Sequence, residues 1–138
     1  KPVDSAKNHL GIRGNMLKAE LFFHKKQWAE GRDSWLLAAQ IQPKPYTAGL
    51  AWYNAAVCCE ELGDTDGARS YYAKAANDEN FLLKTHAIAN MGRIKDESGD
   101  DECAALHYTQ LPDRYPADFW AELAQGRLTT FRAAKRIP

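Results

Sequence analysis

The sequence predicts an all-α fold built from antiparallel helix hairpins. Residues that favour helices (Ala, Leu, Glu, Lys and Arg) dominate between short breaks, and no stretch alternates apolar and polar residues as a strand would. The residues around one break return 36 positions later, as Gly63 and Gly99, Asp64 and Asp100, Ala68 and Ala104, and Tyr72 and Tyr108. A fixed period of this length indicates a stack of repeated hairpins.

Glycine and proline divide the chain into seven predicted helices. Gly63 and Gly99 suit the left-handed position just after a helix, and the aspartate that follows each suits the N-cap of the next helix. Gly11 and Gly14 weaken the first helix, which we expect to bend or to begin later. Pro112 is expected to end the sixth helix early. The predicted helices span residues 5–26, 28–41, 46–62, 65–77, 81–98, 101–110 and 118–134.

The repeated alanine and tyrosine have a physical role in such a stack. One hairpin is too small to bury its own apolar face, so successive hairpins bury it against one another. Ala68 and Ala104 allow two helix backbones to approach closely, and the tyrosine four residues after each alanine fills the space behind it. The 36-residue period therefore reflects a repeated packing geometry.

The overall composition restricts the possible functions. With 138 residues, 45% hydrophobic and 26% charged, the chain is typical of one globular domain, and we assign residues 1–138 to it. Lys plus Arg and Asp plus Glu number 18 each, so no basic excess is available for nucleic acid. No apolar run approaches the ~18 residues of a membrane-spanning helix. The first residue, Lys1, is not methionine, so we expect a trimmed or processed fragment.

No catalytic, cofactor or metal motif is found. The sequence lacks a nucleophile elbow, a P-loop and a dinucleotide fingerprint, so we expect neither an enzyme nor a cofactor. Cys103 and His107, one helical turn apart, supply at most half of a zinc site, and no second pair has matching spacing. Cys58 and Cys59 are adjacent and cannot easily bridge. We therefore expect three free thiols, which are more typical of a reducing compartment.

The repeated residues resemble the tetratricopeptide repeat (TPR), a helix-turn-helix unit. The second repeat, residues 49–82, matches at Trp52, Ala55, Ala56, Gly63, Ala68, Tyr72 and Ala75. The third, residues 85–118, matches at Ile88, Met91, Gly92, Gly99, Ala104, Tyr108, Leu111 and Pro116. The first, residues 12–45, matches at Ala19, Phe22, Trp28, Gly31, Trp35, Ala38 and Pro43. The resemblance implies a right-handed α-solenoid of these three repeats, followed by a capping helix at residues 118–134.

The first repeat departs from the pattern at its turn. It has Lys26 and Gln27 where the other two repeats have glycine and aspartate, and Gly31 where they have alanine. The end of the third repeat is more specific. Its Tyr-Pro, Ala-x-x-Ala and Arg-Leu pattern, within residues 114–128, is similar to bacterial cell-envelope repeat proteins of the outer-membrane assembly or Tol-Pal type. This similarity favours the bacterial periplasm or envelope over the cytoplasm.

The family resemblance implies a non-catalytic scaffold or adaptor that binds a partner protein or peptide on the concave face of its first helices. The dicarboxylate clamp of chaperone-binding relatives is not expected, because four of its positions hold Met16, Glu20, His86 and Asn90. The residues we match to the concave face are Glu20, Phe23, Tyr53, Asn54, Val57, Glu60, Glu61, His86, Asn90, Arg93, Asp96 and Glu97.

Two alternatives stay open at this point. The acidic pairs Glu60–Glu61 and Asp96–Glu97 are either a rim that attracts a basic partner segment or ordinary solvated helix ends. The protein is either a partner-binding scaffold or a small-molecule or lipid-binding accessory protein. In the second case Phe22, Phe23, Trp52 and Tyr53 would lie near an apolar pocket. The sequence does not determine the oligomeric state.

Overall fold

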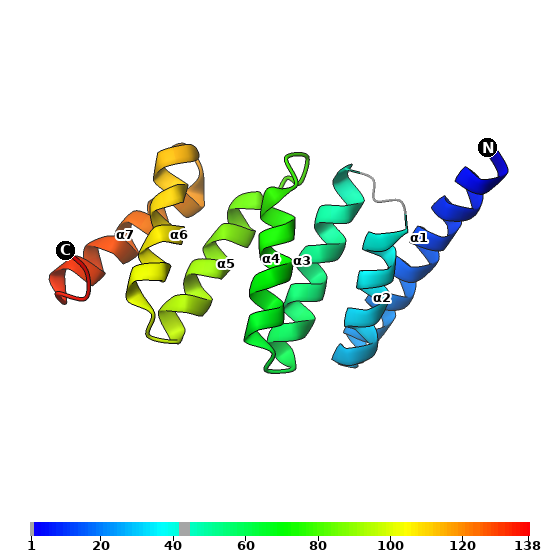
Figure 1. The fold of residues 1–138 in the computed structure, drawn as a ribbon, viewed down its shortest axis with the longest axis horizontal. Coiled ribbons are helices and arrows are strands. Elements are labelled where there is room, and N and C mark those ends of the chain that lie inside the picture. The colour runs from blue at the N-terminus through cyan, green and yellow to red at the C-terminus, as the bar shows by residue number, and fades with distance from the viewer. Residues whose placement is uncertain (1, 42–44) are drawn as a thin grey trace. The chain divides into compact units, whose positions relative to one another are not determined.

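A computed structural model of the chain is helical throughout the part that it describes. It describes the backbone of residues 2–41 and 45–138 and the side chains of residues 11, 13–41 and 47–138. The helices in these ranges are α1 (Pro2–His24), α2 (Trp28–Gln40), α3 (Pro45–Glu61), α4 (Thr65–Asn77), α5 (Lys84–Glu97), α6 (Asp101–Arg114) and α7 (Phe119–Ala133) (Figure 1). No strand occurs in these ranges, so the predicted all-α repeat fold is confirmed.

The helices form two compact units. The N-terminal unit, Lys1–Leu82, holds α1 to α4, and each of these helices packs against the next. The C-terminal unit, Leu83–Pro138, holds α5 to α7, in which α6 packs against both α5 and α7. Figure 1 shows the antiparallel hairpins within each unit. The assignment of residues 1–138 to one domain stays a prediction.

Small side chains dominate the core of the N-terminal unit. A methyl group added to Gly31 of α2 would lie 3.5 Å from Cys58 Sγ of α3 and 3.6 Å from Phe22 Cβ of α1. The absence of a side chain at Gly31 thus lets α2 approach both neighbours closely, as dense protein interiors require. The buried cluster around this contact contains Ala19, Trp35, Ala38, Ala39, Ala51, Ala55 and Cys58.

The repeated alanine and tyrosine are buried, as the sequence predicts. Ala68 and Ala104 have no exposed surface, and Tyr72 and Tyr108 are also buried. In the third repeat the tyrosine ring lies directly over Gly92, where an added Cβ would come within 2.6 Å of Tyr108 Cε1. The small residues of the pattern therefore mark the places where a first helix meets the aromatic ring of the second.

The predicted Gly-Asp turns are confirmed. Gly63 and Gly99 adopt φ values of 79° and 83°, in the left-handed region that glycine enters without strain. The N–H of Asp64 donates to the carbonyl of Cys59 at 2.8 Å, which closes α3. The Asp64 carboxylate then accepts from the Gly67 N–H at 3.0 Å and caps α4. Asp100 caps α6 in the same way.

The first hairpin makes the same turn without the favourable residues. Lys26 takes the left-handed position with φ 56°, and Gln27 N–H donates to Phe22 O at 2.8 Å. Gln27 occupies the N-cap of α2 but makes no side-chain capping bond. A residue with a Cβ is strained in this region, so this turn is less stable than its two counterparts.

We expect the double variant Lys26→Gly, Gln27→Asp to raise the free energy of unfolding by about 1–2 kcal/mol, because it removes the left-handed strain and adds an N-cap. Urea unfolding followed by circular dichroism measures the change. Lys25→Gly is the matched control, because Lys25 does not have a positive φ and should gain nothing. Equal midpoints for the double variant and the unmodified chain would contradict the expectation.

Two local predictions are wrong. Helix α1 does not begin later, because it starts at Pro2 and continues through Gly11 and Gly14, and a bend within it stays a prediction. Packing of α1 on α2 outweighs the weak helix propensity of glycine. Helix α6 continues past Pro112 to Arg114, because the missing N–H of proline removes a single helical bond near the C-terminus. Pro43, which matches the end of the first repeat, lies outside the described residues.

Helix α7 has one buried side and one polar side. Ala121, Ala124, Leu128 and Phe131 are buried in the C-terminal unit. The remaining positions are mostly exposed and polar or small, and they include Glu122, Gln125, Gly126 and Thr129. A polar outer face is typical of a helix that caps a repeat stack. The observed α7 lies within the predicted capping helix at residues 118–134.

Candidate functional site

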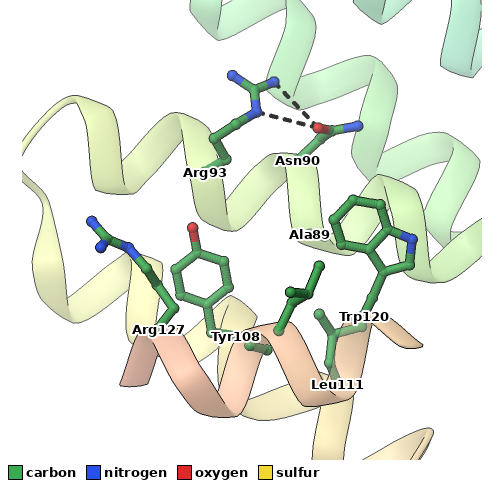
Figure 2. Close-up of a pocket in the computed structure, with 9 residues that line it drawn as sticks. Ala89, Asn90, Arg93, Tyr108, Leu111, Trp120 and Arg127 are labelled. Carbon is green, nitrogen blue, oxygen red and sulfur yellow. Dashed lines mark hydrogen bonds between the residues drawn. The ribbon is translucent and has the colours of Figure 1, made fainter. Parts of the chain in front are cut away.

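An open groove of about 400 Å³ lies between α5, α6 and α7 in the C-terminal unit (Figure 2). Its walls are mostly apolar, with Ala89, Tyr108, Leu111, Trp120, Leu123 and Ala124. Its polar lining residues are Asn90, Arg93 and Arg127. A few polar groups around an apolar hollow are typical of binding sites, and the volume lies in their usual range of about 300–1,000 Å³.

The start of α7 is held in place by an aspartate that makes two different bonds. Asp118 caps α7 by accepting from the Trp120 N–H at 2.8 Å. Its other carboxylate oxygen accepts from the Thr85 hydroxyl, at the start of α5, at 3.1 Å. The ring of His86 meets the Trp120 ring edge to face at 4.9 Å. These contacts fix the tryptophan wall of the groove relative to α5.

A carboxylate beside the groove joins all three helices of the unit. Asp96 of α5 accepts from Arg127 Nε at 2.6 Å and from Arg127 Nη2 at 3.0 Å. It also accepts from Arg136 at 3.2 Å and from the Tyr108 hydroxyl at 3.3 Å. Arg136 in turn pairs with Asp101 at the start of α6. Asp96 is thus a structural acceptor shared by several donors.

The charge states around Asp96 follow from these bonds. The hydrogen bond from Arg127 holds the pKa of Asp96 below its usual value, although partial burial opposes the effect. Burial raises the pKa of Tyr108 to about 12, and the negative charge of Asp96 adds to this rise. At neutral pH the carboxylate is therefore ionised and the tyrosine keeps its proton. This arrangement stabilises the fold and leaves no proton-transfer group poised near neutral pH within it.

Arg93 lines the groove from α5 and is held by two neighbours on the same helix. Its Nε and Nη2 atoms donate to Asn90 Oδ1, each at 3.3 Å (Figure 2). Its Nη1 atom pairs with Glu97, one turn along, at 3.3 Å. The Arg93 side chain is 39% exposed and Glu97 is 65% exposed. Such a surface pair contributes only about 0.3–0.5 kcal/mol, so a binding partner can displace it.

A second pocket, of about 300 Å³, lies in the N-terminal unit. It is lined by Glu20, Phe23, His24, Trp35, Leu50 and Asn54. Trp35 occupies the repeat position of Tyr72 and Tyr108, and Phe23 occupies that of Glu60 and Asp96.

The change of residue types in the first hairpin leaves a buried donor. In the second hairpin the Tyr72 hydroxyl donates to Glu60 at 2.6 Å, as Tyr108 donates to Asp96 in the third. Phe23 offers no acceptor. Among the described residues, the buried indole N–H of Trp35 has no hydrogen-bond partner. An unsatisfied buried donor of this kind costs about 1–3 kcal/mol.

The predicted binding residues of the N-terminal unit fall into two groups. Glu20, Phe23 and Asn54 line the pocket. The other predicted residues have structural contacts or lie nearer the helix end. Tyr53 packs on Tyr72 and Phe81, and Glu60 accepts from Tyr72. Val57 is half-buried and Glu61 is exposed.

The predicted residues of the C-terminal unit lie in or beside the groove. Asn90 and Arg93 line it, and Glu97 pairs with Arg93 at its edge. His86 supports Trp120, and Asp96 holds Arg127. A single concave face that joins both sets of predicted residues stays a prediction.

Sequence reasoning missed the contribution of α6 and α7 to the groove, namely Tyr108, Leu111, Trp120, Leu123, Ala124 and Arg127. A usable signal existed. The left-handed turn after α7 falls at Lys135, with φ 58°, which is 36 residues after Gly99. Continuing the period beyond the third repeat would have placed α7 where the first helix of a further repeat lies. The residues of α7 that face the groove would then have been among the predicted binding residues.

The apolar pocket predicted from four aromatic residues stays a prediction, but two of these residues pack on other aromatic rings. Trp52 stacks on Tyr71 at 5.6 Å, with Lys74 Nζ 4.3 Å from the centre of its ring. Tyr53 packs in the other direction, on Tyr72. Only Phe23 of the four lines the N-terminal pocket. Stacking within the second hairpin thus uses two of the side chains assigned to ligand binding.

No group of three or more His, Cys, Asp and Glu side chains with metal-binding geometry occurs in the described part of the chain. Cys103 Sγ lies 3.8 Å from His107 Nε2 on the same helix, α6. None of the helices in the described ranges is long and apolar enough to cross a membrane.

We expect only one of the three thiols to react quickly in the folded protein. Burial raises the pKa of Cys58 to about 11 and also raises the pKa of Cys59, so both stay protonated at about pH 8. Cys103 is half-buried and accessible. Titration with Ellman's reagent should show one fast thiol in the unmodified chain and none in Cys103→Ser. Three fast thiols would contradict the buried positions of Cys58 and Cys59.

Comparison with known proteins agrees with this architecture. Over 109 residues, 79% of the chain, the sequence is 34% identical to a TPR repeat-containing protein of Treponema pallidum (strain Nichols). This similarity and the helical hairpins together support TPR-type repeats in the chain. The match covers 46% of that relative, so the chain spans about half of its length. No protein-family model matches the chain.

Proposed function

We propose that the chain is a non-catalytic protein–protein interaction module that binds a partner segment along its first helices. The observation that carries this proposal is the groove of the C-terminal unit, where apolar walls from three helices meet Asn90, Arg93 and Arg127. The relationship to a TPR repeat-containing protein supports a scaffold function in general. The absence of a recognised catalytic motif in the sequence supports a non-catalytic function.

The two units offer different chemistry to a partner. In the N-terminal unit Glu20 and Glu61 are exposed and Glu60 is half-buried, which supports the binding of a basic segment there. In the C-terminal unit the Asp96 carboxylate is already shared by Arg127 and Arg136. We therefore restrict the proposed acidic attraction to the N-terminal unit.

We further propose a place in the bacterial cell envelope. The support is the resemblance of the Tyr-Pro, Ala-x-x-Ala and Arg-Leu pattern in residues 114–128 to envelope repeat proteins. Cell fractionation of the epitope-tagged protein tests this part on its own. Recovery in the cytoplasmic fraction alone would remove the envelope proposal and leave the binding function untouched.

The binding function is tested with a partner captured by the epitope-tagged protein after chemical cross-linking. The kinetics of partner binding are then compared for two variants. One is the double charge variant Glu20→Lys, Glu61→Lys, and the other is the single variant Asn54→Ala. The charge variant should slow association, because exposed charges act mainly on encounter, while the alanine variant should speed dissociation. Asp66→Lys, Glu102→Lys is the matched control, since both residues are exposed on second helices.

Two results would overturn the proposal. One is unchanged kinetics in both N-terminal variants and in Arg93→Glu of the C-terminal groove. The other is a loss of binding in the Asp66→Lys, Glu102→Lys control equal to that in the test variants. Circular dichroism of each variant verifies that it is folded.

A further inference from the structure

The lining of the C-terminal groove carries positive charge and no acid. Among its lining residues Arg93 and Arg127 are cationic, and none is Asp or Glu. Figure 2 shows the two guanidinium groups on the side of the groove where the Tyr108 hydroxyl lies, with Trp120 at the other side. The Arg93 and Arg127 side chains are 39% and 42% exposed, so both remain accessible to a ligand.

The acids near these arginines differ in how firmly they are held. Asp96 is only 11% exposed and accepts bonds from Arg127, Arg136 and Tyr108, so its oxygens face inward. Glu97 is an exposed surface partner of Arg93. A carboxylate that arrives with a partner can replace Glu97 on Arg93 at little cost, because exposed pairs contribute little.

The floor and far wall of the groove suit an apolar side chain. Leu111 and Ala124 are buried beneath it. Leu123 projects from α7 with 48% of its surface exposed. Trp120 adds an aromatic wall fixed by Asp118 and His86. An aromatic or long aliphatic side chain placed here would cover Leu123 and contact the Trp120 ring.

We infer that this groove binds an acidic, apolar peptide segment of a partner protein. A large apolar side chain would fill the hollow beside Trp120 and Leu123, and a neighbouring carboxylate would pair with Arg93 and Arg127. The inference rests on the proposed binding function and specifies the partner chemistry at one unit. The peptide segment inferred here is acidic, whereas the segment proposed for the N-terminal unit is basic.

A random peptide library of about 12 residues displayed on phage tests this chemistry. It is first depleted on the bare support and then selected on the unmodified chain. We expect the remaining peptides to carry an aromatic or aliphatic residue with Asp or Glu within about three positions. Their affinity, measured by fluorescence anisotropy, should fall by about tenfold or more in either single variant and fall further with added salt.

Matched controls separate the groove from general surface effects. Arg132→Glu changes an exposed arginine on α7 that does not line the groove, and Leu106→Ala removes a leucine of α6 that is 68% exposed. Both controls should bind the selected peptides within about twofold of the unmodified chain. Leu123 and Arg93 are themselves substantially exposed, so their variants should fold normally.

Three results would overturn the inference. Selected peptides rich in Lys and Arg would contradict the acidic charge inferred for the bound segment. Peptide affinities unchanged by Arg93→Glu and Leu123→Ala would show that the peptides bind outside this groove. If those peptides instead lose affinity in Glu20→Lys, Glu61→Lys, the interaction function stands while the C-terminal assignment fails. If no selected peptide depends on either unit, this inference fails, while the partner-binding kinetics still decide the proposed function.

Discussion

Replacing Phe131 with alanine should lower the free energy of unfolding by about 3–5 kcal/mol, the usual cost of removing a buried phenylalanine. The Phe131 side chain has no exposed surface. It lies against the Tyr108 ring at 6.1 Å between centroids, and the Arg136 guanidinium covers it at 4.2 Å. Alanine would leave a cavity at the contact between α6 and α7 and remove both ring contacts.

Urea unfolding followed by circular dichroism measures this loss. Phe119→Ala is the matched control, because Phe119 lies on the same helix and is 67% exposed. The control should change stability by no more than about 0.5 kcal/mol. If the two variants unfold at the same urea concentration, Phe131 does not hold α7 on α6.

Asp96→Asn is expected to cost about 1.5–3 kcal/mol near neutral pH, because hydrogen bonds to a charged group are stronger than neutral ones. The substitution keeps the shape of the side chain but removes the charge that Arg127 and Arg136 share. The Arg127 side chain is 42% exposed, so solvent weakens its ion pair with Asp96. We therefore expect a cost toward the lower end of this range.

The cost should also depend on pH in a definite direction. Asp96 has a lowered pKa in the folded chain, so its ionised form is favoured by folding. Its contribution to stability is complete above the unfolded value of about 3.9 and is lost as the pH falls through the lower folded value. The difference between the unmodified chain and Asp96→Asn should therefore shrink in acid.

Unfolding in urea at a series of pH values tests this dependence. Asp113→Asn is the control, since Asp113 is exposed on α6. It should leave stability nearly unchanged at every pH. An Asp96→Asn variant as stable as the unmodified chain near neutral pH would show that the network of three donors does not stabilise the unit.

The turns show which parts of the fold are readable from sequence. A left-handed residue followed by an N-cap has strict local requirements, so Gly63–Asp64 and Gly99–Asp100 could be assigned from residue type alone. The first turn was harder, because Lys26 adopts the same backbone without the favourable residue. Packing of whole helices can impose a conformation that local preference opposes.

The groove was less predictable because its parts are distant in the chain. Arg127 and Asp96 are 31 residues apart, and Asp118 and Thr85 are 33 apart. Nothing in the local pattern of either residue indicates its partner. Asn90 and Arg93 were accessible to prediction because both lie on one helix face at known repeat positions. The residues from α6 required the packing of the hairpin to be known first, whereas those from α7 could be reached only by continuing the repeat period.

The missing acceptor at Phe23 has a consequence for how freely the hairpins can be exchanged. The second and third hairpins each contain both the tyrosine and the carboxylate of an internal hydrogen bond. A copy of either hairpin at another place in a stack would therefore keep that bond. The first hairpin carries Trp35 and Phe23 instead. A designer who repeats hairpins within a stack can therefore duplicate α3–α4 without adding a polar partner, whereas a copied α1–α2 must be given an acceptor for its indole.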